Sequence, residues 1–194
     1  MAPETTPARE WSEARQGSGV EHPDDLPDTA LLLVERTFCF ADLSGFTRYT
    51  QDNGPHRAVT LLDEFRAVSR DVAAKRGVRV AKWLGDGVML VGTEPTPTIA
   101  WGGHMIDHFS DEKDINVRVG LATGEALLFE GDDYIGEPVN LAAKLCAEAD
   151  PGEILALCMT ADFPDWIRAE AVDELSIRGV GSIGGVQRLS VEAR

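Results

Sequence analysis

The sequence has few of the features that would place it at a membrane or outside the cell. No apolar run approaches the ~18 residues that a membrane-spanning helix needs. The longest run near the start, Ala30 to Val34, is short and flanked by acids. Met1-Ala-Pro-Glu has neither the basic start nor the apolar stretch of a signal peptide. We therefore expect a cytoplasmic protein without a membrane partner.

Cysteine and basic residues are also scarce. The three cysteines, Cys39, Cys146 and Cys158, lie in apolar contexts without metal-ligand spacing, so we expect reduced thiols that pack in the interior. The chain has 18 Lys and Arg against 33 Asp and Glu, a formal net charge of −15. Polyanions are bound through basic surfaces, so we expect no nucleic-acid partner. A small, highly charged ligand would need several of these few cations to converge locally.

The composition changes near residue 30. Residues 1–30 are rich in Pro, Thr, Ser, Gly, Glu and Asp, with few large apolar groups, and are expected to form a mostly flexible tail. Residues 31–194 contain alternating and helical apolar patterns. We expect these residues to form one catalytic domain with its own core.

Residues 55–75 have apolar residues at helical spacing, and the predicted stripe comprises Val59, Leu62, Phe65, Val68 and Val72. Further helices are expected at 98–109, 137–148 and 164–171. Strands are expected at 35–43, in a pair over 78–92, in a hairpin over 115–131 that turns at Gly120 to Gly124, at 152–158, and in a last pair over 171–193. This order predicts an α+β fold, a ferredoxin-like sandwich with helices on one face of a mostly antiparallel sheet.

Two aspartates stand at the ends of predicted strands. Asp42 closes the first strand, and Asp86 lies between two glycines at a hairpin tip. In a ferredoxin-like sheet the first strand is central and adjoins this hairpin, so the two carboxylates could meet. Adjacent anions repel each other, and a divalent cation such as Mg²⁺ or Mn²⁺ would hold them together while sharing its coordination shell with substrate phosphates.

The residues after Asp42 fit the same kind of site. Leu43 to Thr47 form a turn of mostly small residues, whose backbone N–H groups could approach a triphosphate next to a helix N-terminus. Spacing alone leaves the common alternatives open, in which Asp42 is a helix N-cap and Asp86 an exposed turn residue.

Six ordered motifs carry a family resemblance. They are FADLSGFT (40–47), KWLGDGVM (82–89), VRVGLATGE (117–125), GDDYIGEPVNLAAKL (131–145), PGEIL (151–155) and LSIRGVG (175–181). In this order the motifs make the chain resemble the catalytic domain of class III adenylyl and guanylyl cyclases, from about Glu35 to the last strand. The class III nucleotidyl cyclase fold is the ferredoxin-like sandwich expected above.

The resemblance implies a role for each matched position. Asp42, Asp86 and the backbone carbonyl of Leu43 would bind two Mg²⁺ or Mn²⁺ ions, and Lys82 with Asp133 would read adenine. Asn140 would orient the ribose, and Lys144 stands where the family has an arginine that stabilises the transition state. The residues implied in triphosphate binding are Ser44, Gly45, Phe46, Thr47, Arg118 and Arg178.

Lys144 is a departure from the family pattern, because an ammonium lacks the planar fork of donors of a guanidinium. We interpret it as the mark of a slow enzyme rather than an inactive one. The residues alone leave other uses open, namely a solvated helix lysine for Lys144 and sheet-edge charges for Arg118 and Arg178.

The resemblance predicts an adenylyl cyclase that converts ATP to 3′,5′-cyclic AMP and pyrophosphate by two-metal-ion catalysis. In the family the metal residues and the base-reading residues of one site come from opposite subunits, so we expect a homodimer with two composite sites. A guanylyl cyclase is the alternative that Lys82 and Asp133 disfavour. A nucleotide-binding regulatory domain with little or no turnover is the alternative that Lys144 motivates.

Overall fold

The computed structural model describes residues 32–110, 115–158 and 162–192. The tail expected at residues 1–30 lies outside them. Leu32 to Arg194 form one compact unit. None of the described helices is both long and apolar enough to cross a membrane.

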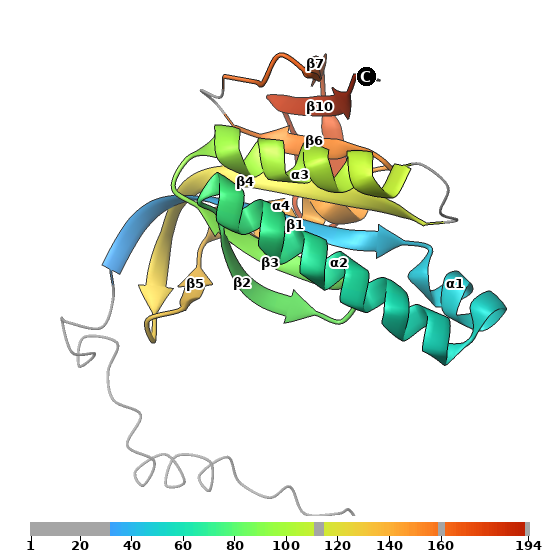
Figure 1. Ribbon diagram of the computed structural model, residues 1–194. Coiled ribbons are helices and arrows are strands. Elements are labelled where there is room, and N and C mark those ends of the chain that lie inside the picture. The colour runs from blue at the N-terminus through green and yellow to red at the C-terminus, as the bar shows by residue number, and fades with distance from the viewer. Residues whose placement is uncertain (1–31, 111–114, 159–161, 193–194) are drawn as a thin grey trace, which may run out of the picture. The chain divides into compact units, whose positions relative to one another are not determined.

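The helices are interspersed with the strands up to α4, and only strands follow it (Figure 1). The helices are α1 (Phe46–Asn53), α2 (Pro55–Arg76), α3 (Pro95–Ser110) and α4 (Glu137–Glu148). The strands are β1 (Leu32–Ser44), β2 (Arg79–Leu84), β3 (Gly87–Gly92), β4 (Asn116–Phe129), β5 (Asp133–Ile135), β6 (Ile154–Leu157), β7 (Ile167–Val172), β8 (Leu175–Ile177), β9 (Gly181–Ile183) and β10 (Val186–Val191).

The main sheet has the strand order β2-β3-β1-β4-β6-β10-β7, with β5 paired to β4. β1 lies between β3 and β4 and is antiparallel to both. The pairing of β4 with β6 is parallel, and the other pairings are antiparallel. The structure therefore confirms an α+β fold with a mainly antiparallel sheet and a central first strand.

The helices cover both faces of the sheet, so the prediction that they all lie on one face is wrong. α2 and α3 lie on the near face in Figure 1, and α4 lies behind the sheet. Alternate residues of β1 separate the two layers: Cys39, Ala41 and Leu43 pack in the core under α2 and α3, whereas Phe38 packs with Leu141 and Ala142 of α4. Asp42 follows the same alternation and faces the α4 side.

The predicted turn at Gly120 to Gly124 is wrong, because β4 runs unbroken through both glycines. Gly120 is needed for close packing instead. A Cβ atom there would lie 2.0 Å from the backbone N of Cys146 and 2.3 Å from the carbonyl O of Ala142. The α4 backbone therefore rests directly on the β4 backbone.

Two predictions for the C-terminal part are also wrong. Residues 164–171 were expected to be helical, but Ile167–Val172 form β7, which pairs with β10 at the sheet edge. The last strand pair divides, because β8 and β9 form a separate two-stranded sheet while β10 joins the main sheet. Pairing with neighbouring strands outweighs the local helical signal here.

The predicted helix over 55–75 is confirmed as α2, but its apolar stripe is displaced. The buried residues are Ala58, Leu61, Phe65, Ser69 and Ala73. Of the predicted stripe, Phe65 is buried, Val59 is 56% exposed, and the others are partly buried against the core. The buried face of α2 therefore combines three small residues with Leu61 and Phe65.

Replacing Gly120 tests the contact between α4 and β4. Gly120→Ala should lower the free energy of unfolding by about 3 kcal/mol, because the new methyl group overlaps backbone atoms that cannot move independently. Gly124→Ala is the matched control, since its Cβ would meet Pro138 at 3.4 Å, an ordinary contact. We expect the control to change stability by no more than about 1 kcal/mol. Equal urea midpoints for the two variants would contradict this packing.

Candidate active site

Asp42 and the Asp86 turn lie together at one end of the sheet. Asp42 is paired in register with Gly87 of β3, and the Leu43 N–H donates to the Asp86 carbonyl O at 3.3 Å. Gly85 adopts the left-handed conformation that the tight turn requires, with φ of 71°. A Cβ at Gly87 would lie 2.9 Å from the Ala41 carbonyl O and 3.3 Å from the Asp42 Cβ. The two glycines therefore serve different needs, one for the turn and one for the space beside Asp42.

The Asp42 carboxylate is held by Arg118, its cross-strand partner on β4. Arg118 Nε donates to Asp42 Oδ1 at 2.7 Å, and Nη2 donates to Oδ2 at 2.9 Å. Both side chains are 30% exposed. These hydrogen bonds raise the pKa of Arg118 above its ordinary value, which partial burial opposes and the charges of Asp42 and Asp86 support. The structure thus places a cation directly on the carboxylate predicted to bind metal.

Lys82 of β2 and Asp133, the first residue of β5, form a second pair. Lys82 Nζ lies 2.7 Å from Asp133 Oδ1, which also accepts the Tyr134 N–H at 3.0 Å. The hydrogen bond from Lys82 is the main reason that the pKa of Asp133 is lowered. The two side chains are 42% and 47% exposed, so their polar atoms remain accessible to a ligand. The residues predicted to read one base therefore lie together.

Of the two predicted α4 residues, Lys144 has a contact within the chain that the sequence did not predict. Asn140 is exposed near the start of α4. Lys144, one turn later, donates from Nζ to the carbonyl O of Arg178 at 2.8 Å. Lys144 therefore ties α4 to the segment that joins β8 and β9, and the side chain of Arg178 is exposed.

The predicted triphosphate turn is shorter than expected. Ser44 is the last residue of β1, Gly45 is the left-handed N-cap residue of α1, and Phe46 and Thr47 are its first residues. Asp42 is therefore not the N-cap. A polar cleft of about 700 Å³ lies beside this junction and is lined by Ser44, Gly45, Arg48, Tyr49, Asp52, Asn53, Asn116 and Pro151.

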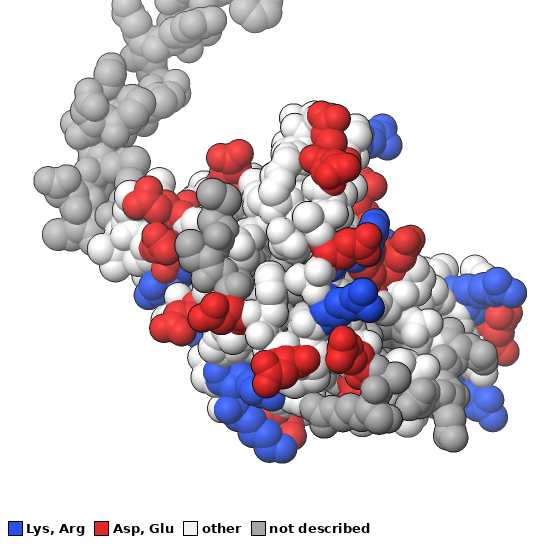
Figure 2. Space-filling view, turned by 90° about the horizontal axis from the view of Figure 1, so that it is seen from above, with Lys and Arg blue, Asp and Glu red and all other residues white. Residues whose placement is uncertain are grey.

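The predicted residues thus form three groups: the Asp42–Arg118 pair with the Asp86 turn, the Lys82–Asp133 pair, and Asn140 with the Lys144–Arg178 contact. In the described ranges, no hydrogen bond or ion pair joins one group to another. On the face seen in Figure 2, acidic and basic side chains are interspersed rather than gathered into one basic surface. Among the predicted cations, Lys82 and Arg118 each pair with one carboxylate, and Lys144 donates to a backbone carbonyl.

The cysteines are not part of these groups as nucleophiles. Cys39, Cys146 and Cys158 are buried and free. Burial raises the pKa of all three thiols, and that of Cys146 rises to about 12. Thiols in such surroundings are inert at neutral pH.

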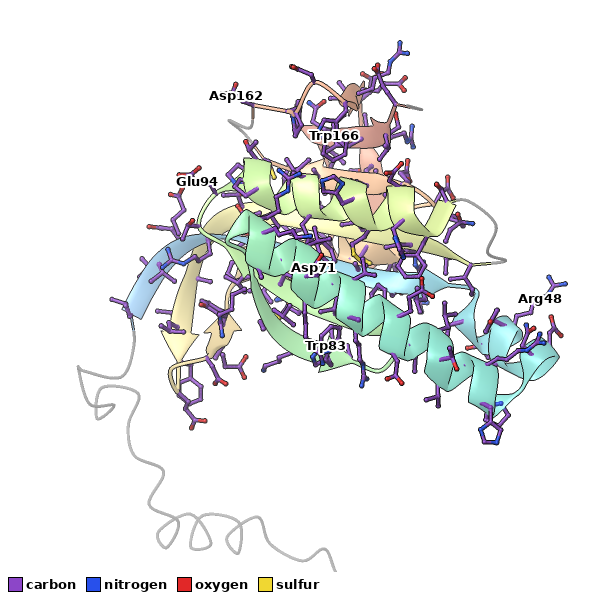
Figure 3. All side chains as sticks on the ribbon, in the orientation of Figure 1. Arg48, Asp71, Trp83, Glu94, Asp162 and Trp166 are labelled. Atoms are coloured by element: carbon purple, nitrogen blue, oxygen red, sulfur yellow. The ribbon has the colours of Figure 1, made fainter. Side chains whose placement is uncertain are left out.

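Sequence reasoning missed a support for the Asp86 turn. Arg66 and Arg70 of α2 lie over the ring of Trp83 at 5.3 and 5.0 Å from its centroid, and Trp83 lies below α2 (Figure 3). Arg66 Nη2 also donates to the Gly85 carbonyl O at 3.4 Å. Arginines four apart on a helix carry no signal of such a contact, because Trp83 is more than ten positions away in the sequence.

Methionine substitutions test this support. Arg66→Met should speed amide hydrogen exchange at residues 85–87 about fivefold, because one hydrogen bond to the turn is lost. Arg70→Met is the matched control, since it removes a comparable stacking cation but no bond to the turn. Exchange would be followed by mass spectrometry. Similar rates in both variants would show that Arg66 does not hold the turn.

Comparisons with known proteins bear on this arrangement. The sequence model described as the adenylate and guanylate cyclase catalytic domain matches residues 35–187. An uncharacterized protein of Mycobacterium tuberculosis is 43% identical over 142 residues, covering 72% of this chain and 37% of that protein. A pH-sensitive adenylate cyclase of the same species is 32% identical over 120 residues, covering 61% of this chain and 30% of that protein. The chain therefore spans only about a third of the length of these curated relatives.

A solved structure supports the fold. The catalytic core of a rhodopsin-guanylyl cyclase with converted specificity, in complex with ATPalphaS, has a TM-score of 0.71 and 17% sequence identity. The match covers 84% of this chain and 99% of that one. Together with the family match over residues 35–187, this identifies the chain as a member of the adenylate and guanylate cyclase catalytic domain family, with the class III cyclase fold.

Proposed function

We propose that this cyclase domain acts on ATP and forms 3′,5′-cyclic AMP and pyrophosphate. The observation that carries the choice of base is the Lys82–Asp133 pair, whose Nζ and Oδ1 atoms are 2.7 Å apart. A relative adds support, since one of the two similar M. tuberculosis proteins is a pH-sensitive adenylate cyclase.

The pair suits the edge of adenine. Lys82 can donate to the ring N1, and Asp133 can accept from the 6-amino group beside it. Guanine presents a donor at N1 and an acceptor at the 6-position. The donor Lys82 would then face a donor, and the acceptor Asp133 would face an acceptor. A site whose polar groups are left unpaired rejects the wrong base strongly. A guanylyl cyclase is therefore the less favoured alternative.

The residues at the end of β1 fit a divalent cation. The pair with Arg118 shows that the partly exposed Asp42 carboxylate binds a cation, and Asp86 belongs to the adjoining turn. Within the described residues, no three Asp, Glu, His or Cys side chains converge into a ready-made cation cage. Mg²⁺ is typically bound by one or two carboxylates together with water and substrate phosphates. Asp42, Asp86 and the Leu43 carbonyl would therefore hold Mg²⁺ or Mn²⁺, two ions per site.

When bound, such ions ease deprotonation of the ribose 3′-hydroxyl and neutralise the triphosphate. The reaction requires the 3′-oxygen to attack the α-phosphorus while the bond to pyrophosphate breaks. In our proposal Asn140 orients the ribose by hydrogen bonding. Lys144, Arg118 and Arg178 supply positive charge to the phosphates, together with backbone N–H groups of residues 44–47.

Lys144 bears on the rate. Its ammonium has three donors, and one is used on the Arg178 carbonyl. The ammonium would act on a phosphate as a compact point charge, whereas an arginine would offer a planar fork of two parallel donors. This observation favours a slow cyclase, and it keeps a regulatory nucleotide-binding domain as the second candidate.

A homodimer would complete the proposed site. The Asp42 group and the Lys82–Asp133 and Asn140–Lys144 groups occur on one chain, yet no hydrogen bond or ion pair of the described residues joins them. Two copies related by a two-fold axis can bring the metal residues of one chain to the base-reading residues of the other. We propose two equivalent composite sites per dimer.

The first test is a substrate assay. Purified protein with Mn²⁺ should form cyclic AMP from ATP at least about 10² times faster than cyclic GMP from GTP. Lys82→Met should reduce this ratio about tenfold, because it removes the donor to the base. Lys75→Met is the matched control, since Lys75 forms an equally short pair with Asp71 on α2.

Each other outcome of this assay selects an alternative. Faster turnover of GTP would overturn the assignment of the base. Tight nucleotide binding without any product would favour the regulatory domain. Asp42→Ala should abolish product formation in either cyclase.

The second test concerns the composite site. Asp42→Ala and Asn140→Ala homodimers should each be inactive, whereas their mixture should regain about a quarter of wild-type activity after subunit exchange. The recovery arises because half of the dimers are mixed and each mixed dimer has one intact site. Heterodimers would be verified by two different affinity tags. No recovery in verified heterodimers would contradict a site shared between chains.

A further inference from the structure

The Asp42–Arg118 pair joins the predicted metal ligand to a cation of the same chain. Its two hydrogen bonds, at 2.7 and 2.9 Å, use both carboxylate oxygens. The residues are directly opposite each other on β1 and β4, so the backbone register itself sets the pair. Paired hydrogen bonds between guanidinium and carboxylate are among the stronger polar contacts in proteins.

Arg118 has a third contact that does not involve Asp42. Its Nη1 donates to the carbonyl O of Ala147 at 3.0 Å. Ala147 lies in the last turn of α4, where carbonyl groups lack partners within the helix and carry partial negative charge. One nitrogen of Arg118 is therefore anchored at α4, while Nε and Nη2 serve Asp42.

We propose that Arg118 is an exchangeable counter-cation of Asp42, which competes with a divalent ion for this carboxylate when nucleotide is absent. The inference rests on the proposed function, in which Asp42 is a metal ligand. The guanidinium contacts both oxygens that a metal ion would use, and two cations on one carboxylate repel each other. Metal alone therefore binds weakly.

Nucleotide relieves this competition. A triphosphate offers Nε and Nη2 of Arg118 another anion, while the bond from Nη1 to Ala147 keeps the side chain beside the site. The free energy of transferring the guanidinium from carboxylate to phosphate is small, because one charge-assisted contact replaces another. Divalent ion and nucleotide consequently bind with positive coupling, and each raises the affinity for the other.

The test measures Mn²⁺ binding without turnover, from the electron paramagnetic resonance signal of free Mn²⁺. In the full chain without nucleotide, Arg118→Gln should bind Mn²⁺ about tenfold more tightly than wild type, because the competing hydrogen bonds are lost. Arg118→Lys keeps the charge but loses the paired geometry, so its affinity should lie between the two. With an ATP analogue that has a methylene group between the α- and β-phosphorus atoms and so cannot release pyrophosphate, wild type should gain Mn²⁺ affinity and Arg118→Gln should gain much less.

Arg188→Gln is the matched control for charge. Arg188 also pairs with a carboxylate, that of Glu153, and its replacement changes the net charge equally. Unchanged or weaker Mn²⁺ binding in Arg118→Gln, or equal tightening in Arg188→Gln, would overturn the competition. If Arg118→Gln does not fold, as judged by circular dichroism, Arg118→Lys still decides the direction.

Asp42→Asn separates this inference from the proposed function. Loss of Mn²⁺ binding in Asp42→Asn, without tightening in Arg118→Gln, would reject the competition and retain the metal site. Wild-type Mn²⁺ binding in Asp42→Asn would reject the metal site and therefore both proposals.

Discussion

The pairing register of β1 is the constraint on which the rest of this structure depends. β1 is paired with β3 on one side and with β4 on the other, and this places Asp42 opposite both Gly87 and Arg118. A shift of one residue would turn Asp42 into the core beneath α2 and α3 and bring Leu43 to the α4 face. Burial of Cys39, Ala41 and Leu43 opposes such a shift, so the hydrophobic core also fixes the polar site.

The parts of the fold that could be predicted from the sequence are those with strong local signals. The Gly85-Asp86-Gly87 turn and the start of α4 at Glu137 follow from residue type and spacing. The central position of the first strand follows from the predicted ferredoxin-like fold. The juxtaposition of Lys82 and Asp133 came from the resemblance of motifs rather than from spacing, because 51 positions separate the two residues.

The remaining features depend on contacts that local patterns do not encode. In the sequence Gly120 is typical of a turn, but its role is to admit the α4 backbone. The residues of β7 have a helical pattern, but pairing with β10 makes them a strand. The same holds for Arg118, which the motifs relate to a triphosphate but which pairs with Asp42. A residue can satisfy a family pattern and still have a second partner that only the folded chain supplies.

The contact of α4 with β4 has a consequence for how the domain can move. The backbones of α4 and β4 are in direct contact at Gly120, so no side chains lie between them there that could repack and let α4 shift. α4 and the central strands should then move as a rigid body, with Asn140 and Lys144 at fixed positions relative to Asp42 of the same chain. In a homodimer, opening and closing of the composite sites would then be governed by rotation of one copy against the other.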